Sequence, residues 1–119
     1  MAQIIDKEEL PCDEYTWEFQ GYRYSDTSVS FIIVEAQPGE GPKLHSHPYE
    51  EVFIVQEGQA TFTVGESTIE VIAGQIVVAP AHTPHKFINS GTGILRQVDI
   101  HASPRFITTW YDERSDMRT

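Results

Sequence analysis

Short β-strand patterns recur along the chain from Tyr15 onward, and glycine, proline or asparagine separates each from the next. No stretch shows a long helical repeat of apolar residues. A chain of 119 residues is long enough for a single core but not for two. We therefore predict an all-β fold in one domain. The strand-like segments are 17–24, 29–36, 51–56, 60–64, 68–72, 75–79, 85–89 and 94–101, and segment 105–111 fits either a short helix or a last strand.

Two of the predicted strands are apolar on both faces. Residues 52–55 read Val-Phe-Ile-Val, and residues 76–78 read Ile-Val-Val. An antiparallel sheet with one face in water normally alternates apolar and polar residues. Apolar side chains on both faces indicate that the outside of the barrel is covered as well, and we predict a homodimer.

Three histidines and one glutamate carry the strongest chemical signal. His45 and His47 are two residues apart, so on an extended strand both leave the same face, and Glu51 keeps that parity. His85 follows later, after a glycine and two prolines. Any one of them alone is more often a surface or core residue than a ligand. Together they suit a divalent transition metal (Mn, Fe, Ni, Zn or Cu) and leave coordination positions open for water or substrate.

These four residues belong to two longer motifs, Gly39 to Gly58 and Gly74 to Asn89, separated by residues 59–73. The spacing resembles the paired motifs of the cupin superfamily, in its small single-domain, cupin 2 type. The resemblance implies a cupin double-stranded β-helix, or jelly-roll, barrel with the four residues as metal ligands. It departs at His82, where the family usually has glycine. We expect His82 to be a turn residue that faces solvent, because histidine tolerates a positive φ better than bulky residues do.

Strand parity also predicts the walls of a pocket. Phe53 and Val55 share the face of Glu51, whereas Glu50 points away and is not expected to be a ligand. Phe87 shares the face of the histidine two residues before it. An apolar cavity with a polar centre is the usual make-up of a small-molecule site. Packing in the core is the other interpretation of these side chains, and both can hold at once.

The strand predicted over 94–101 admits two orientations. One face would present Ile94, Arg96, Val98 and Ile100, and the other Leu95, Gln97, Asp99 and His101. On pattern alone the more apolar set would face the core. However, the spacing of Asp99, His101 and Arg105 resembles that of small cupins that open the ring of unsaturated uronates. There an Asp, a Phe and an Arg line the pocket.

That resemblance implies catalytic roles for these three residues. Asp99 and His101 would exchange protons, and Arg105 would bind a carboxylate. His101 replaces the aromatic residue of those relatives, so the match is partial. The alternative is that Asp99 and Arg105, with Arg96, form surface ion pairs of small energetic weight.

Composition and chain ends bound the remaining possibilities. We divide the chain into an N-terminal arm (1–14), the barrel (15–112) and a C-terminal tail (113–119), and an arm of this kind often pairs with a neighbouring subunit in small cupins. The net charge of −10, from 8 basic and 18 acidic residues, disfavours nucleic acid and anionic membranes as partners. No secretory signal or membrane-length apolar run is present, and Cys12 is the single cysteine. We therefore expect a cytoplasmic protein.

Two functions remain open from the sequence. The first is an enzyme acting on a small polar, carboxylated or enolisable molecule by metal Lewis-acid chemistry. Zn or Mn would favour isomerase, lyase or decarboxylase reactions, and Fe, Ni or Cu would favour the dioxygenase chemistry of other cupins. The second is a non-catalytic module that binds or senses a small ligand. A purely structural metal is disfavoured because structural sites are usually closed.

Overall fold

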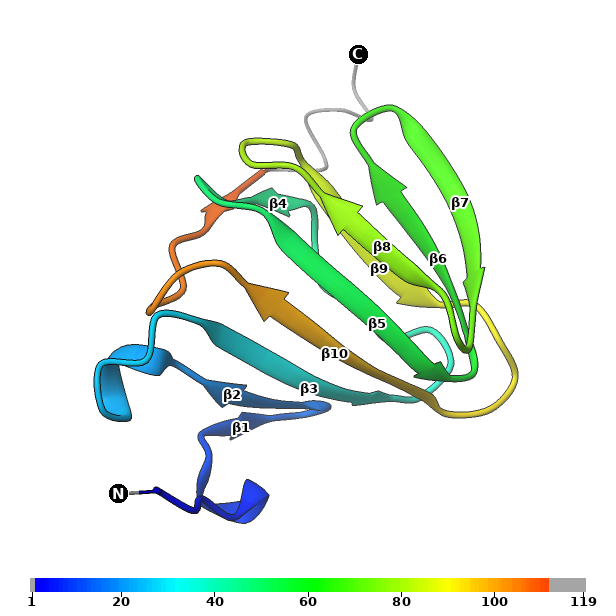
Figure 1. Cartoon of the computed structure of the whole chain (residues 1–119). Coiled ribbons are helices and arrows are strands. Elements are labelled where there is room, and N and C mark those ends of the chain that lie inside the picture. Colours follow the sequence, from blue (N-terminus) through cyan, green and yellow to red (C-terminus); the bar gives the residue numbers. More distant parts are fainter. Residues whose placement is uncertain (1, 112–119) are drawn as a thin grey trace.

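The computed structural model describes residues 2–111, which form two antiparallel β-sheets facing each other (Figure 1). The all-β prediction is confirmed. One sheet has the strand order β1-β2-β3-β10-β5-β8, and the other has the order β11-β4-β9-β6-β7. The strands are β1 (Cys12–Asp13), β2 (Thr16–Phe19), β3 (Ser30–Ala36), β4 (His45–Ser46), β5 (Glu51–Glu57), β6 (Gln59–Val64), β7 (Ser67–Ile72), β8 (Ile76–Ala79), β9 (His85–Asn89), β10 (Leu95–His101) and β11 (Thr109–Trp110).

The chain passes back and forth between the two sheets from β3 to the end, which is the path of a double-stranded β-helix. This path brings β4, β5, β9 and β10 together although they are far apart in sequence. His45 of β4 pairs with His85 of β9, and Glu51 of β5 pairs with His101 of β10. The fold therefore gathers four chemically active side chains at one end of the barrel.

Alternating apolar side chains fill the space between the sheets. In β5, Glu51, Phe53 and Val55 are buried, whereas Val52 and Ile54 on the opposite face are only partly so. The predicted parity of this strand is confirmed, and Glu50 is exposed as expected. The core that they join consists of Val34, Ala36, Phe53, Val55, Ala60, Phe62, Val71, Val77, Ala79, Phe87 and Leu95.

Strand β10 faces the interior with its more polar side. Leu95, Gln97, Asp99 and His101 are all buried, and the alternate residues Arg96, Val98 and Ile100 face outward. The expectation from hydrophobic pattern alone is therefore wrong for this strand. The orientation implied by the resemblance to other small cupins is correct for Asp99 and His101.

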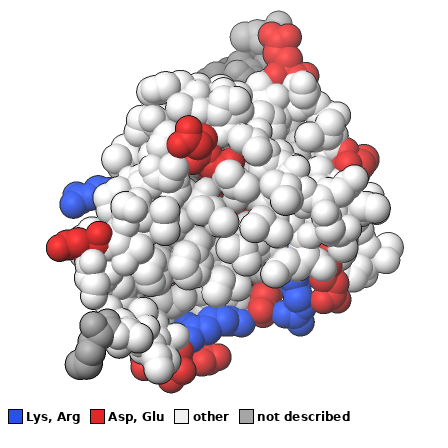
Figure 2. All heavy atoms as spheres, in the orientation of Figure 1, with Lys and Arg blue, Asp and Glu red and all other residues white. Residues whose placement is uncertain are grey.

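The outer face of the six-stranded sheet carries two apolar rows that cross five strands. The rows are Val78, Val52, Ile100, Phe31 and Phe19, and next to them Ile76, Ile54, Val98, Ile33 and Trp17. Arg96 lies beyond their end and pairs with Glu35 and Glu57. Figure 2 shows a broad, mostly uncharged surface, with one group of acidic side chains in its upper part and the other charged side chains of both signs at its margins. An apolar face of this extent on a folded chain normally marks an interface.

The segment predicted as one strand over 17–24 is shorter than expected. β2 ends at Phe19, and a 3₁₀ turn follows at Gly21–Arg23. A Cβ atom at Gly21 would overlap the carbonyl oxygens of Thr27 and Val29. Only glycine therefore allows the backbone of this turn to approach the following segment so closely. At the other end, β11 shows that segment 105–111 contains a last strand rather than a helix.

The structure describes the N-terminal arm from residue 2 onward but not the C-terminal tail. Residues of the N-terminal arm pack on their own barrel: Lys7 lies 4.1 Å from the centre of the Trp17 ring, and Cys12–Asp13 pairs with β2. Pairing of the arm with a neighbouring subunit stays a prediction. The predicted tail, 113–119, lies outside the described residues. No helix among residues 2–111 is long and apolar enough to cross a membrane.

Candidate metal centre

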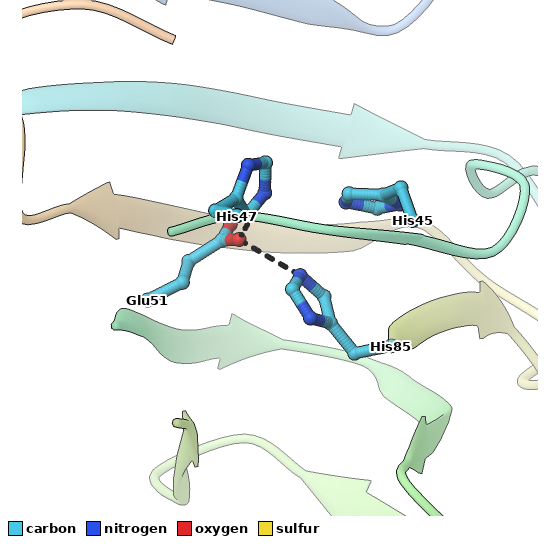
Figure 3. A group of neighbouring side chains, drawn as sticks. All are labelled: His45, His47, Glu51 and His85. Carbon is cyan, nitrogen blue, oxygen red and sulfur yellow. Dashed lines mark hydrogen bonds and ion pairs between the residues drawn. The ribbon is translucent and has the colours of Figure 1, made fainter. Parts of the chain in front are cut away.

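His45, His47, Glu51 and His85 meet at the end of the barrel where β4, β5 and β9 come together (Figure 3). One potential ligand atom from each lies within 4.8 Å of the others, and all four residues are buried. The glycine and proline breaks around the motifs end the strands here, so the four side chains enter the same space from three strands. The predicted set converges without exception.

Each of the three histidines is oriented by a backbone carbonyl. The Nδ1 atom lies 2.7–2.8 Å from its partner: His45 on Lys43, His47 on Ile107 and His85 on Thr83. A carbonyl oxygen can only accept, so Nδ1 must carry the hydrogen in all three rings. In neutral imidazoles this leaves the Nε2 lone pairs free to bind a metal.

The Nε2 atoms confront a carboxylate oxygen in an arrangement that requires a cation. Oε1 of Glu51 lies 3.1 Å from Nε2 of His47 and 3.0 Å from Nε2 of His85. In the tautomer fixed by the backbone, both nitrogens are acceptors facing another acceptor. Nε2 of His47 is buried without a hydrogen-bond partner. Only a proton or a metal ion among these atoms relieves the repulsion, so the residues present fit a bound divalent metal.

Burial and mutual contacts shift the titration of this group in the direction that favours metal binding. Burial lowers the pKa of His45 from 6.5 to about 4, so its imidazole stays neutral at physiological pH. Burial alone would raise the pKa of Glu51. However, the contact with His101, together with those of His47 and His85 when a proton lies between these rings and the carboxylate, outweighs burial, and the pKa of Glu51 lies well below its usual range. Neutral nitrogens and an ionised carboxylate are the forms that bind metals.

A cavity of about 360 Å³ opens beside the four ligands. Phe53 and Phe87 line it as predicted, together with Ile32, Val34 and Phe106. Val55 does not line it and is instead packed in the core, so its pocket role is wrong. Val55 does point into the barrel, as predicted, but it lies two residues further along β5 than Phe53 and so below the cavity.

The three predicted catalytic residues do not stay together. Asp99 and His101 are buried and line the cavity. Arg105 is exposed, does not line the cavity, and lies 4.9 Å from the centre of the Tyr22 ring. The expectation that Arg105 binds a substrate carboxylate is not supported by this position. His82 is exposed with φ of 65°, which matches the expected turn residue.

Asp99 is a buried carboxyl in a mostly apolar setting. Its Oδ1 accepts a hydrogen bond of 2.8 Å from Nε2 of Gln97. Burial, with a smaller contribution from the negative charge of Glu51, raises the pKa of Asp99 well above 3.8. Asp99 is therefore suited to hold a proton that it can release to a neighbouring group.

Sequence reasoning missed several side chains around the cavity. Trp110, 60% exposed, lies with its ring centre 4.8 Å from that of His45 and forms part of the rim. Tyr49 lies between two ligands in sequence, and its hydroxyl is 2.7 Å from Nδ1 of His101. The aromatic residue between His47 and Glu51 could have been noticed in the sequence as a candidate site residue. Its partner His101, however, lies fifty-two positions further along the chain.

Comparison with known proteins agrees with this fold and site. A family model described as the cupin domain matches residues 32–101. The chain belongs to the cupin family. An uncharacterised protein of Streptomyces coelicolor is 35% identical over 68 residues, 57% of this chain and 63% of that protein. The HTH-type transcriptional regulator PuuR of Escherichia coli is 30% identical over 81 residues, 66% of this cupin and 43% of the regulator. The cupin thus spans less than two thirds of these relatives.

Solved structures give the same architecture. The oxalate decarboxylase of Lactobacillus farciminis, in a formate complex, superposes with a TM-score of 0.77 at 25% identity, covering 92% of this cupin and 36% of that chain. A Klebsiella pneumoniae protein with a double-stranded β-helix domain superposes with a TM-score of 0.70 at 20% identity. That match covers 94% of this cupin and 99% of the other chain. The second likeness shows that a stand-alone protein of this size has the same fold.

Proposed function

We propose that this cupin is a metal-dependent enzyme that moves a proton on a small polar molecule bound beside the metal. The observation that carries the proposal is the position of Asp99. A fully buried carboxyl with a raised pKa lines the same cavity as His45, His47 and Glu51 of the candidate metal centre. A barrel that only binds a ligand has no need of such a group, which lowers stability at neutral pH.

A metal held by His45, His47, Glu51 and His85 would act as a Lewis acid that polarises a carbonyl or hydroxyl oxygen of the substrate. The chain's own groups supply the rest. Asp99 holds a proton at its carboxyl, and Gln97 keeps that carboxyl oriented through Oδ1. Phe53, Phe87 and the other apolar walls exclude water, which strengthens these electrostatic interactions.

The lining of the cavity favours an uncharged substrate. Asp13, Glu18, Glu51 and Asp99 are among the lining residues, and none of the described lining residues is lysine or arginine. With Arg105 outside, a substrate carboxylate would find a positive partner in the metal alone. An enolisable ketone, diketone or hydroxy ketone fits this lining better than a dicarboxylate. The likeness to oxalate decarboxylase supports an enzymatic reaction on a small molecule in this barrel but is too distant to assign oxalate as substrate.

A non-catalytic, ligand-sensing role is the second candidate, and the similarity to the regulator PuuR favours it. The two roles predict different behaviour of the metal-loaded protein. A sensor binds a ligand and releases it unchanged, whereas the enzyme converts it. The metal also divides the enzymatic options, because a redox-active ion such as Fe, Cu or Mn can bring oxygen consumption, whereas Zn cannot.

The experiment loads the protein separately with Mn, Zn, Fe and Ni and follows product formation and oxygen uptake on ketones, diketones, uronates and catechols. We expect turnover with an enolisable ketone. The variant Asp99→Asn should reduce kcat by roughly 10²- to 10⁴-fold and leave metal content unchanged. Glu50→Gln, which alters an exposed carboxylate, is the matched control and should keep full activity. Absence of turnover in every metal form, with ligand binding retained, would support the sensor instead.

We also propose that a second copy of the chain covers the outer face of the six-stranded sheet. The two apolar rows on that face contain no charged residue, so a partner of strong charge finds nothing to pair with there. Two identical faces would bury each other without leaving an unmatched charge. The ion pairs of Arg96 with Glu35 and Glu57 lie at the border, where an interface is usually polar.

A further inference from the structure

A fourth histidine lies against the metal centre but is held differently from the three ligands. His101 is buried, and its Nε2 is 3.1 Å from Oε2 of Glu51. The two atoms lie outside hydrogen-bond geometry, so the contact is purely electrostatic, and Nε2 has no hydrogen-bond partner. Oε1, the other oxygen of Glu51, faces His47 and His85. The carboxylate therefore has one oxygen toward the ligand histidines and one toward His101.

The partner of Nδ1 separates His101 from the ligand histidines. Those three rings have Nδ1 against a carbonyl oxygen, which can only accept. Nδ1 of His101 instead lies 2.7 Å from the hydroxyl of Tyr49, which can donate. That hydroxyl already accepts the backbone N–H of Ile107 at 3.3 Å, so its own hydrogen is available for His101. This places the imidazole hydrogen of His101 on Nε2, facing Glu51.

The opposite tautomer is disfavoured by charge. If Nδ1 carried the hydrogen, the lone pair of Nε2 would face a carboxylate oxygen at 3.1 Å in a buried setting. Two acceptors at that distance repel, and in a buried setting this repulsion is costly. The Nε2–H form replaces this repulsion by attraction between an N–H and a carboxylate.

We infer that Tyr49 and His101 are positioning residues for the metal centre. Tyr49 fixes the tautomer and rotation of His101, and His101 holds Oε2 of Glu51 so that Oε1 is presented to the metal. His101 is then not a ligand itself. The inference rests on the proposed metal centre and adds two residues to it. Partners of this kind typically change metal affinity by 10- to 100-fold when they are removed.

The test measures the dissociation constant for Mn²⁺ and Zn²⁺ by isothermal titration calorimetry on metal-stripped protein. Tyr49→Phe removes only the hydroxyl and keeps the ring stacked on His47, and we expect binding to weaken by about 10-fold. His101→Leu removes the donor, and we expect a loss of 10- to 100-fold. His101→Gln keeps a side-chain N–H at similar reach and should recover most of the affinity. Tyr22→Phe, an exposed tyrosine outside the cavity, is the matched control and should bind as the natural chain does.

Three results would overturn the inference. If Tyr49→Phe and His101→Leu bind both metals as tightly as the natural chain, neither residue positions the site. If His101→Gln is as defective as His101→Leu and the loss equals that of His85→Ala, His101 is a direct ligand instead. If His101→Leu loses affinity but Tyr49→Phe does not, Tyr49 has no part in it. Failure of the natural chain itself to bind metal is a different outcome, because it removes the proposed metal centre as well.

Discussion

Acidification should destabilise the metal-free protein through His45. Burial lowers the pKa of this side chain from 6.5 to about 4 in the folded state. Between these values the unfolded chain binds a proton that the folded chain does not, so stability falls as the pH falls. The linkage relation gives a loss of about 2 kcal/mol between pH 7 and pH 5, and about 3 kcal/mol by pH 4. The pH 5 figure is a large part of a typical domain stability of about 5–15 kcal/mol.

The assay is thermal unfolding of chelator-treated protein at pH 7, 6 and 5, above the range where exposed carboxylates titrate. A loss of about 2 kcal/mol corresponds to a decrease in Tm of about 6–10 °C for a chain of this size. His45→Asn removes the titrating group, so on acidification from pH 7 to pH 5 its Tm should change less unfavourably than that of the natural chain by this amount. The comparison cancels the opposite pH dependence of Asp99, which both chains share. His82→Asn removes an exposed histidine at a position with positive φ, which asparagine tolerates, and should keep the full decrease. If His45→Asn loses as much Tm as the natural chain on acidification, the reasoning about its burial is wrong.

Three further predictions concern stability and assembly. Because burial raises the pKa of Asp99, the folded chain holds its proton more tightly than the unfolded chain, and stability falls as the pH rises above 3.8. Asp99→Asn should therefore raise Tm at pH 7, and this gain should vanish below pH 4. Ile54→Glu in the middle of the apolar rows should convert a dimer to a monomer by light scattering, and a monomeric natural chain at micromolar concentration would contradict the interface. Gly58→Ala should lower the free energy of unfolding by about 2 kcal/mol or more, seen as a lower urea midpoint, because Gly58 has φ of 88° and a Cβ would overlap the carbonyl of Ile94; an unchanged midpoint would count against this.

The sequence predicted the ligand set because spacing and strand parity are local properties. His45 and His47 are two residues apart, so their shared direction follows from extended backbone. Glu51 follows a bend at residues 48–49 and belongs to a strand of the other sheet, so its convergence with them rests on the motif and not on parity. His85 required the motif resemblance, since nothing local says that β9 lies beside β4. The pairing of His45 with His85 comes from the topology of the two sheets.

The orientation of β10 could not be predicted from hydrophobicity. Val98 and Ile100 are the apolar set, yet they face outward because the rows on that side continue across neighbouring strands. Inside, Gln97, Asp99 and His101 find partners in each other, in Glu51 and in Tyr49. The residue pattern of one strand shows neither the apolar rows on the neighbouring strands nor the polar partners inside the barrel. Cores that include a polar site break the rule that the apolar face points inward.

Two other errors have similar causes. Arg105 was assigned to the cavity by spacing from Asp99, but the chain turns after His101 and carries it to Tyr22. Tyr49 was overlooked because its role depends on His101, a contact over fifty-two positions. Residues whose function depends on a long-range contact are the ones that one sequence does not identify.

The most direct test of the metal centre is elemental analysis of purified protein. The natural chain, stripped and reconstituted with a divalent transition metal, should retain the metal in near-stoichiometric amount after gel filtration. His47→Ala removes a buried ligand and should lose most of that metal, whereas His82→Asn should retain it. A metal content of His47→Ala equal to that of the natural chain would contradict the site and every role assigned around it.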